Sequence, residues 1–241
     1  MNKNKLQKEL NSFQNIWSGG FFSGYSKKRN QRGLEHYLSE NLIGSTLLEI
    51  GCGGGQWSKF INDLEIYNKI YCIDALSETH NKFWDYLGES AKSKIQYEHI
   101  QDFSLSFIED NSLDYVFSYD VFCHISYSGL ESYLTALFKK CKVGSILLIM
   151  YADPKKYLGS EPENKYHVER YLPNKKLIYK FSKKKLISDA LLDFDGEPSE
   201  GRWYWIGIEK FTKACEDAGF KILSKDLDID KTNPITLFSK L

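Results

Sequence analysis

The sequence predicts an α/β fold with a mostly parallel β-sheet and helices on both of its faces. Short apolar runs recur along the chain, and segments with helical periodicity separate them, which is typical of strands buried on both sides. A glycine-rich turn follows the first run directly, and an acidic residue follows the second. The seven predicted strands are 46–50, 69–73, 95–99, 113–117, 145–151, 221–228 and 235–240.

Helical segments are predicted between these strands and before the first of them. They are 2–15, 27–42, 55–64, 76–87, 129–140 and 206–218. The alternation breaks after the fifth strand, where residues 153–204 are charged, aromatic and rich in proline. We interpret 1–241 as one domain with an N-terminal helical cap at 1–42 and an insertion at 153–204.

Composition restricts the partners and the compartment. The 241 residues are 42% hydrophobic, which is enough for a sizeable core, and the formal net charge is zero. A neutral chain has no general attraction to nucleic acid or to a membrane surface, so neither is expected as a partner. Five cysteines without a C-x-x-C pair indicate reduced, buried thiols. The polar start leads into no apolar segment, so we expect a cytoplasmic protein.

The turn after the first strand indicates a ligand site. Gly51, Gly53 and Gly55 alternate, so that only bare backbone lines the junction between strand and helix, and glycine tolerates the positive φ that such a turn needs. The unpaired amides at the start of the next helix favour an anionic group. A dinucleotide fold would place its third glycine at position 56, where this chain has Gln56, which disfavours a nicotinamide dehydrogenase.

The motif Glu-x-Gly-x-Gly-x-Gly at residues 49–55 resembles the first motif of class I S-adenosylmethionine-dependent methyltransferases. The resemblance implies a Rossmann-like sheet of seven strands in which the last strand is antiparallel. It also implies S-adenosylmethionine as the cofactor, with Glu49 near its methionine ammonium group. Insertions after the fifth strand commonly build the acceptor pocket in this superfamily, so 153–204 is expected to bind the acceptor.

Five further residues are predicted to contact the cofactor. Asp74 ends the second strand, where its carboxylate can accept hydrogen bonds from both ribose hydroxyls or cap a helix. In the family pattern an acidic residue at the position of Asp102 contacts the adenine amino group, although a surface turn is the alternative. Trp57 could line the cofactor or belong to the core. Ser118 is assigned to this site at the end of the fourth strand. Tyr25 belongs to an aromatic loop that could form a lid or simply pack on the sheet.

Acceptor chemistry is predicted at the ends of the fourth and fifth strands. Asp120 and His124 would share one face if residues 120–124 begin a helical turn. Asp153 follows the fifth strand, and Pro154 favours an extended backbone there. Either His124 or Asp120 acts as the general base, or Asp120, His124 and Asp153 hold a divalent metal ion that orients the acceptor. The structural alternative is that Asp120 caps a helix and His124 belongs to the core.

An aromatic cluster near the end of the insertion is a candidate for substrate binding. Arg202 can pair with phosphate, and Lys155 and Lys156 could join it in binding a nucleotide diphosphate. The rings of Trp203 and Tyr204 can stack on a sugar or a base. Alternatively, the tryptophans of this cluster pack the insertion onto the sheet.

Three segments are similar to bacterial sugar O-methyltransferases from surface-polysaccharide gene clusters, and most of all to capsular heptose O-methyltransferases. They are 117–125, 151–154 and 201–205. The resemblance implies a GDP-linked heptose as substrate and a dependence on metal. Two alternatives remain open: methylation of a small apolar or phenolic acceptor, and a non-catalytic cofactor-binding partner protein.

Overall fold

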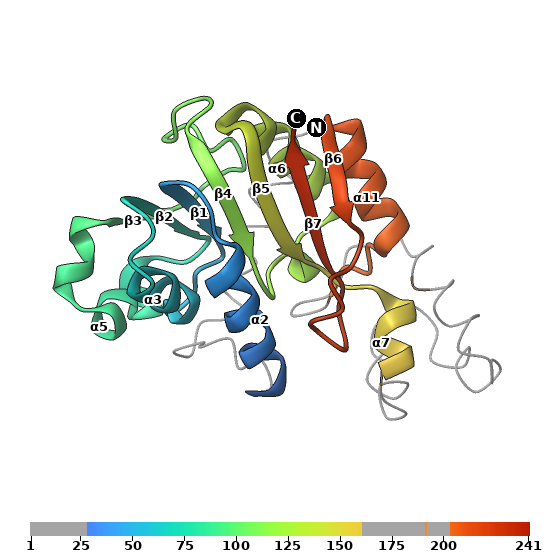
Figure 1. The fold of residues 1–241 in the computed structure, drawn as a ribbon, viewed down its shortest axis with the longest axis horizontal. Helices are drawn as coiled ribbons and strands as arrows, with labels where there is room; N and C mark the ends of the chain where they lie inside the picture. Colours follow the sequence, from blue (N-terminus) through green and yellow to red (C-terminus); the bar gives the residue numbers. More distant parts are fainter. Residues whose placement is uncertain (1–27, 161–190, 192–202) are drawn as a thin grey trace.

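The computed structural model describes residues 28–160, 191 and 203–241, and the strands in these ranges form one seven-stranded sheet in the order β3-β2-β1-β4-β5-β7-β6 (Figure 1). Strands β1 to β5 run parallel to one another, whereas β7 is antiparallel to both β5 and β6. The strands are β1 Thr46–Ile50, β2 Lys69–Asp74, β3 Ile95–His99, β4 Leu113–Ser118, β5 Cys141–Met150, β6 Phe220–Ser224 and β7 Ile235–Lys240. The predicted Rossmann-like sheet is confirmed, including its antiparallel last strand.

Helices cover both faces of the sheet (Figure 1). Helices α6 and α11 pack on one face, and α2, α3 and α5 pack on the other. The described helices are α2 Lys28–Asn41, α3 Gln56–Asp63, α4 Glu78–Asn81, α5 Phe83–Leu87, α6 Tyr127–Lys140, α7 Pro154–Ser160 and α11 Ile208–Asp217, with 3-10 helices η1 Glu89–Ser93 and η2 Phe122–His124. None of them combines the length and the apolar character that a bilayer-spanning helix needs.

Burial on both faces explains why the strands read as continuous apolar runs. In β4, Val116 packs towards α6, while Tyr115 and Phe117 pack towards α2 and α3. Neighbouring β5 repeats the pattern, with Leu147 on the first face and Leu148 on the second. Alternate side chains therefore supply two separate cores, and these two central strands need apolar residues at most of their positions.

Several element boundaries differ from the predictions. The helix predicted at 76–87 is two short helices, because Lys82 adopts a left-handed backbone with φ of 51°. The strand predicted at 221–228 ends at Ser224. The helix predicted from residue 129 begins at Tyr127, since the Ser126 hydroxyl accepts a hydrogen bond from the Gly129 amide at 3.1 Å and caps it.

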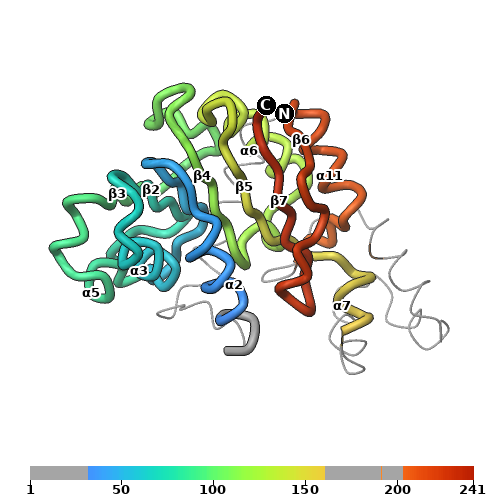
Figure 2. Tube along the Cα trace, viewed as in Figure 1, coloured from blue at the N-terminus to red at the C-terminus, as the bar shows by residue number. Residues whose placement is uncertain are grey.

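Most of the predicted cap and insertion lies outside the described residues. The structure describes α2 from the cap, and from the insertion it describes 153–160, Leu191 and 203–204. The chain path in Figure 2 places α7 beside the loop that joins β6 to β7, below the ends of the parallel strands. The strand order reverses between β1 and β4, and ligands of open α/β sheets bind outside the carboxyl ends of strands at such a point.

Candidate active site

The turn from β1 to α3 leaves backbone uncovered at the sheet's carboxyl edge. Gly51, Gly53 and Gly55 have φ values of 74°, 51° and 87°, all in the left-handed region that favours glycine. The Gly51 amide donates to the carbonyl oxygen of Ile73 at 2.7 Å, which holds the turn against the end of β2. A Cβ atom on Gly51 would lie 2.2 Å from a methyl carbon of Val121, so the turn has no room for a side chain at that position.

Asp74 fixes the shape of this turn. One of its carboxylate oxygens accepts the Gly53 amide at 2.9 Å, and the other accepts the Leu76 amide at 2.8 Å. Burial raises the pKa of this carboxyl group. The residue therefore orients the glycine turn from the end of β2, while hydrogen bonds to the ribose stay a prediction.

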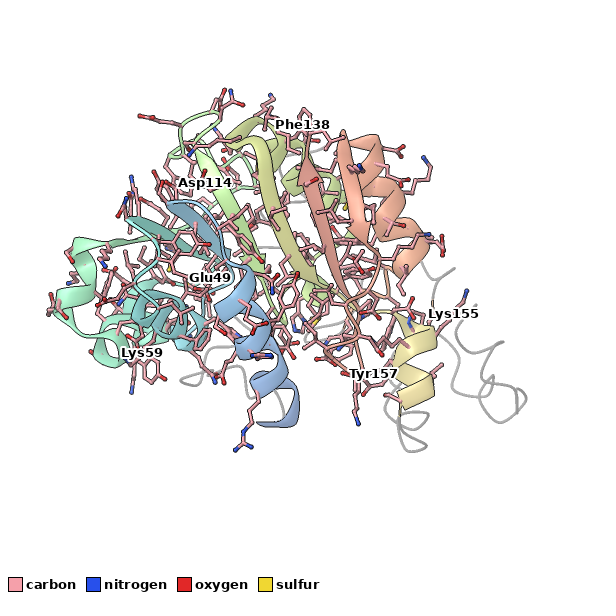
Figure 3. The ribbon with its side chains drawn as sticks, in the orientation of Figure 1. Glu49, Lys59, Asp114, Phe138, Lys155 and Tyr157 are labelled. Carbon is pink, nitrogen blue, oxygen red and sulfur yellow. The ribbon has the colours of Figure 1, made fainter. Side chains whose placement is uncertain are left out.

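Glu49 is a buried carboxyl group one residue from the end of β1 (Figure 3). Its Oε2 accepts the Ser58 hydroxyl at 2.5 Å, and the Cys72 thiol donates to the same oxygen at 3.8 Å. Burial raises the pKa of Glu49 to about 8. The side chain therefore holds a proton at neutral pH, and a cationic group placed beside it would favour the ionised form.

These residues fit S-adenosylmethionine. The turn presents bare backbone at two left-handed glycines, Gly51 and Gly53, and Asp74 lies within hydrogen-bonding distance of it. Glu49 supplies a carboxyl group near the same edge that a cationic amino group would stabilise. A ligand with a ribose and a cationic amino-acid part matches this set.

Four other predicted cofactor residues have contacts of their own. Trp57 is buried and packs edge-on against Phe117 and Tyr119, so the structure gives it a place in the core. The Ser118 hydroxyl donates to the Ile50 carbonyl at 3.0 Å and ties β4 to β1. Exposed Asp102 accepts the Ser104 amide at 2.8 Å within a surface turn. The fourth, Tyr25, lies outside the described residues. A cofactor contact by any of them stays a prediction.

The end of β4 carries a cluster of possible proton acceptors and metal ligands. One ligand atom each from Asp120, Cys123 and His124 lies within 4.8 Å of the other two. The Cys123 thiol donates to Asp120 Oδ1 at 3.6 Å. Burial is the main cause that raises the pKa of Asp120, to about 6. A carboxylate with this pKa is more basic than an ordinary aspartate and is still largely ionised at neutral pH.

The predicted helical face shared by Asp120 and His124 is wrong, although the two side chains do converge. Asp120 has φ of 62°, in the left-handed region, and a 3-10 turn follows at Phe122–His124. Aspartate tolerates this backbone better than most residues do. Val121, next to Asp120, packs on Gly51, so the cluster lies directly beside the glycine turn.

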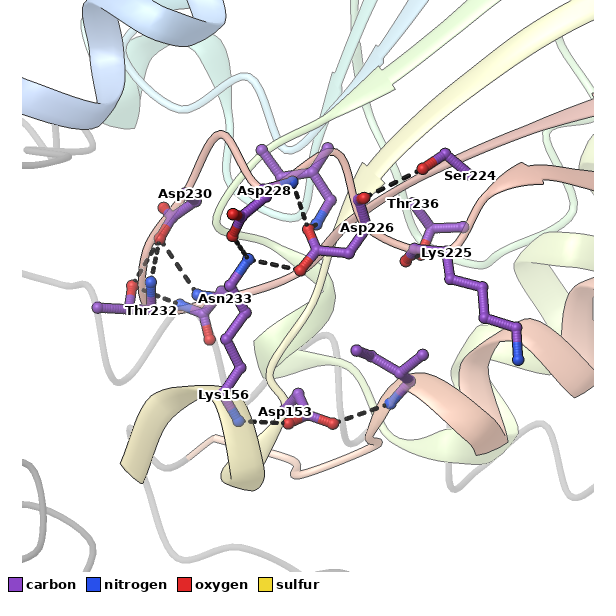
Figure 4. A network of polar contacts seen from close by, with 12 residues as sticks. Asp153, Lys156, Ser224, Lys225, Asp226, Asp228, Asp230, Thr232, Asn233 and Thr236 are labelled. Atoms are coloured by element: carbon purple, nitrogen blue, oxygen red, sulfur yellow. Dashed lines mark hydrogen bonds and ion pairs between the residues drawn. The ribbon is translucent and has the colours of Figure 1, made fainter. Parts of the chain in front are cut away.

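Asp153 is not part of this cluster, contrary to the predicted metal set. Its Oδ1 accepts the backbone amide of Lys156 at 2.7 Å, and its Oδ2 accepts that of Ile208 at 3.0 Å (Figure 4). The carboxylate therefore caps α7 and holds the first residue of α11. Cys123, which the sequence did not single out, occupies the third position beside Asp120 and His124.

The described residues do not form the predicted binding site for a nucleotide diphosphate. The Lys156 ammonium group pairs with Asp226 and lies 3.2 Å from Asp228, in the loop between β6 and β7 (Figure 4). Two carboxylates thus already neutralise its charge. Lys155 is exposed on α7 (Figure 3), and Arg202 lies outside the described residues.

The chain at the end of the insertion is held against the cluster after β4 and against the end of β5. The Tyr204 amide donates to the Cys123 carbonyl at 2.7 Å, and Trp205 forms a parallel bridge with Ala152. Trp203 packs edge-on against Tyr157 and Trp205, with ring centroids 5.3 and 5.4 Å apart. The tryptophans therefore pack the insertion onto the sheet, and substrate contacts of Trp203 and Tyr204 stay a prediction.

Asp230 is a residue at this edge that the sequence interpretation missed. Its Oδ2 accepts the Tyr119 hydroxyl at 2.6 Å, and its Oδ1 accepts the amides of Thr232 and Asn233. The antiparallel β7 brings the preceding loop to the carboxyl ends of β4 and β5. Aspartates at alternate positions 226, 228 and 230 are the signal that could have identified this loop.

Comparison with known proteins identifies the family. The model of a methyltransferase domain matches residues 22–225. Phosphoethanolamine N-methyltransferase 2 of Caenorhabditis elegans is 34% identical over 109 residues, or 45% of this chain, but the chain covers only 24% of that relative's length.

Solved structures share the fold. One is a magnesium protoporphyrin IX methyltransferase from Synechocystis PCC 6803, determined with bound S-adenosylhomocysteine. It is 16% identical to this chain with a TM-score of 0.55, and the match covers 99% of both chains. A methyltransferase from Methanosarcina mazei is 16% identical with a TM-score of 0.57, over 85% of this chain and 97% of that one. The family match spans most of the chain and includes the glycine turn, Asp74 and the cluster after β4. The chain therefore belongs to the class I S-adenosylmethionine-dependent methyltransferases.

Proposed function

We propose that the protein transfers a methyl group to a hydroxyl of a nucleotide-linked sugar, a GDP-heptose used for capsular polysaccharide. The observation that carries the proposal is a base-bearing cluster directly against the cofactor turn, through the contact of Val121 with Gly51. A sugar hydroxyl is a poor nucleophile, so its methylation needs such a base. The resemblance of segments 117–125, 151–154 and 201–205 to sugar O-methyltransferases supports the choice of acceptor.

Asp120 acts as the general base in this proposal. S-adenosylmethionine, when bound, supplies an electrophilic methyl group on a sulfonium. With the cofactor bound, the Asp120 carboxylate would accept the proton of the acceptor hydroxyl, and the cofactor would supply the methyl group that replaces this proton on the oxygen. A pKa of about 6 suits this task, because the carboxylate is ionised at neutral pH and binds a proton more readily than an ordinary aspartate.

Positioning supplies the rest of the rate enhancement. The hydrogen bond from Tyr204 to the Cys123 carbonyl holds the cluster in place, and the Asp74 carboxylate holds the glycine turn. Correct alignment of acceptor and donor is worth several kcal/mol of the barrier, on the order of 7–11 in well-oriented cases. Trp203 and Tyr204 are half-buried, and their rings would support the sugar or its base by stacking.

An amine acceptor is the second candidate. The 34% identity to a phosphoethanolamine N-methyltransferase over 45% of the chain favours it. An amine must also lose a proton before or during methylation, so Asp120 would serve the same purpose there.

A panel of acceptors with radiolabelled S-adenosylmethionine tests the proposal. The panel contains GDP-sugars including heptoses, phosphoethanolamine and a small phenol. We expect labelled product with a GDP-heptose and its loss in Asp120→Asn, whereas Asp217→Asn, the same change at an exposed position of α11, retains activity.

Each alternative has its own outcome. Product with phosphoethanolamine alone would replace the sugar by the amine, and product with the phenol alone would indicate a small apolar acceptor. Cofactor binding without turnover of any acceptor would favour the non-catalytic partner protein.

A further inference from the structure

The cluster after β4 combines three kinds of metal ligand in five residues. Asp120 offers a carboxylate, Cys123 a thiol and His124 an imidazole, and their ligand atoms all lie within 4.8 Å of one another. The oxygen and sulfur of Asp120 and Cys123 are 3.6 Å apart. In a tetrahedral zinc site with a Zn–S bond of 2.3 Å and a Zn–O bond of 2.0 Å, these two atoms would be about 3.5 Å apart.

The backbone holds these ligands in place before any ion binds. The left-handed Asp120 turns the chain back after β4, and the His124 amide donates to the Val121 carbonyl at 2.8 Å. From outside this segment, the Tyr204 amide donates to the Cys123 carbonyl at 2.7 Å. A site whose ligands are already gathered loses little conformational freedom on binding.

The three side chains of the cluster differ in their burial. The Cys123 side chain is fully buried in an apolar cluster with Ala152, Leu158, Leu191 and Trp205. By contrast, Asp120 and His124 are only half-buried. An apolar backing behind a thiolate and a partly open front match a three-ligand site with one position left for a further ligand.

We propose that Asp120, Cys123 and His124 bind a divalent cation of the zinc class, with the Cys123 thiolate as one of its three protein ligands. Thiolate and imidazole ligands favour Zn²⁺ or Co²⁺, whereas Mg²⁺ prefers oxygen ligands alone. Binding displaces the thiol proton, so one proton is released for each ion bound.

This inference rests on the proposed function in a single respect, namely that the open position faces the acceptor oxygen. A hydroxyl bound to the ion would lose its proton more readily, and Asp120 would then act as a ligand in place of a base. Ion binding itself depends only on the three side chains, and it can be measured without any acceptor.

Cobalt titration of the full chain, first treated with chelator, tests the site. We expect one Co²⁺ per chain, the near-ultraviolet charge-transfer band of a cobalt–thiolate bond, and displacement of cobalt by Zn²⁺ but not by excess Mg²⁺. Cys123→Ser should abolish the band and weaken binding by more than about 100-fold, beyond what loss of an outer partner of a ligand costs. Cys141→Ser is the matched control, because Cys141 is equally buried but begins β5 at the opposite edge of the sheet.

Other results would overturn the site. They are a titration without the thiolate band, or a Cys123→Ser chain that binds cobalt as tightly as the parent. Thermal unfolding shows whether each variant folds, and Cys123→Ala and His124→Gln replace any variant that does not. The two proposals fail separately. An intact cobalt site with no methylation of any acceptor in the panel contradicts the proposed function. If the parent chain binds no metal but methylates an acceptor, and Asp120→Asn loses this activity, only the metal site is contradicted.

Discussion

The carboxyl groups of Glu49 and Asp120 lie at the ends of neighbouring strands, and their pKa values differ because their surroundings differ. Glu49 is enclosed between β1, α3 and β2, where, among the described residues, the neutral Ser58 hydroxyl and Cys72 thiol donate hydrogen bonds to it. Asp120 is only partly buried, and beside the burial that raises its pKa it interacts with the negative charge of Asp230. Burial therefore keeps Glu49 protonated at neutral pH, while Asp120 remains ionised and basic.

The pH profile of methyl transfer should report Asp120. The reaction needs its ionised form, so kcat/KM measured in excess chelator should rise with pH and level off above about pH 6. Asp120→Asn should lower kcat by about 10²- to 10⁴-fold and remove this rise, with cofactor affinity unchanged by calorimetry. A profile with the same inflection in the variant would exclude Asp120 as the base.

The pH dependence of stability should report Glu49. Its folded-state pKa is raised from 4.5 to about 8, so between these values the folded chain binds more protons than the unfolded chain. This stabilisation is complete below the unfolded pKa and is lost as the pH rises through about 8. We expect urea unfolding to show a fall in free energy over this window that is smaller in Glu49→Gln. Parallel curves for the two proteins would contradict the assignment.

At the scale of elements, turns and caps bring the site together. The β1–α3 turn is packed against the β4 end by Val121 on Gly51, and the insertion is held by Asp153 at the start of α7. On its other side, α7 is tied to the β6–β7 loop by Lys156 and Asp226. Asp153 also accepts the Ile208 amide, so it joins the start of α7 to α11, which is distant in sequence.

Gly51→Ala should disrupt both the turn and the cluster beside it. The new Cβ would meet Val121 at 2.2 Å, in addition to the strain of a left-handed backbone with φ of 74°. Gly144→Ala is the matched control, because Gly144 has φ of 84° and nothing lies within 4 Å of its Cβ position. We expect the control to cost about 1–2 kcal/mol in unfolding experiments, and Gly51→Ala to cost more and weaken cofactor binding. Equal costs and unchanged affinity would show that the Val121 contact is unimportant.

Lys156→Met should loosen α7. The change leaves the mostly buried Asp226 carboxylate without its ammonium partner, at a cost of about 1–3 kcal/mol. In α11, Lys213→Met breaks an exposed pair with Asp217 and should cost about 0.5 kcal/mol or less. Limited proteolysis near residue 160 should be faster in Lys156→Met alone. Equal proteolysis of both variants would contradict an anchoring role for Lys156.

At the scale of the whole molecule, the two edges of the sheet have different roles. The carboxyl edge gathers the glycine turn and the cluster after β4. At the opposite edge, Lys240 near the end of β7 donates to Asn111 Oδ1 at 3.0 Å and to the carbonyls of Phe138 and Cys141 at 2.7 and 2.9 Å. One side chain thus joins β7 to the end of α6, the start of β5 and the loop before β4.

Lys240→Met should therefore separate stability from function. Losing these hydrogen bonds should lower the free energy of unfolding by about 2–4 kcal/mol, while the activity of the folded protein is unchanged because the site lies at the other edge. Exposed Lys221 in β6 provides the control, and Lys221→Met should change stability by about 0.5 kcal/mol or less. Reduced kcat in folded Lys240→Met would show that the two edges are coupled.

The local parts of the fold were predictable from the sequence. The glycine turn, the strand positions and Asp74 depend on residue types within a few positions, so apolar runs and alternating glycines identify them. Boundaries such as the break at Lys82 were not predictable, because a single left-handed residue ended the helix without a glycine or proline.

The sequence by itself determined the fold class and predicted the glycine turn as the site of the cofactor. Only the tertiary structure decided which acceptor-side residues meet. Because Asp120 has a left-handed backbone, Cys123 lies beside Asp120 and His124 in the folded chain. Asp153 instead caps α7. The antiparallel β7 brought Asp230 to the same edge. These contacts depend on backbone conformations and strand pairings far apart in the chain, which local residue patterns do not encode.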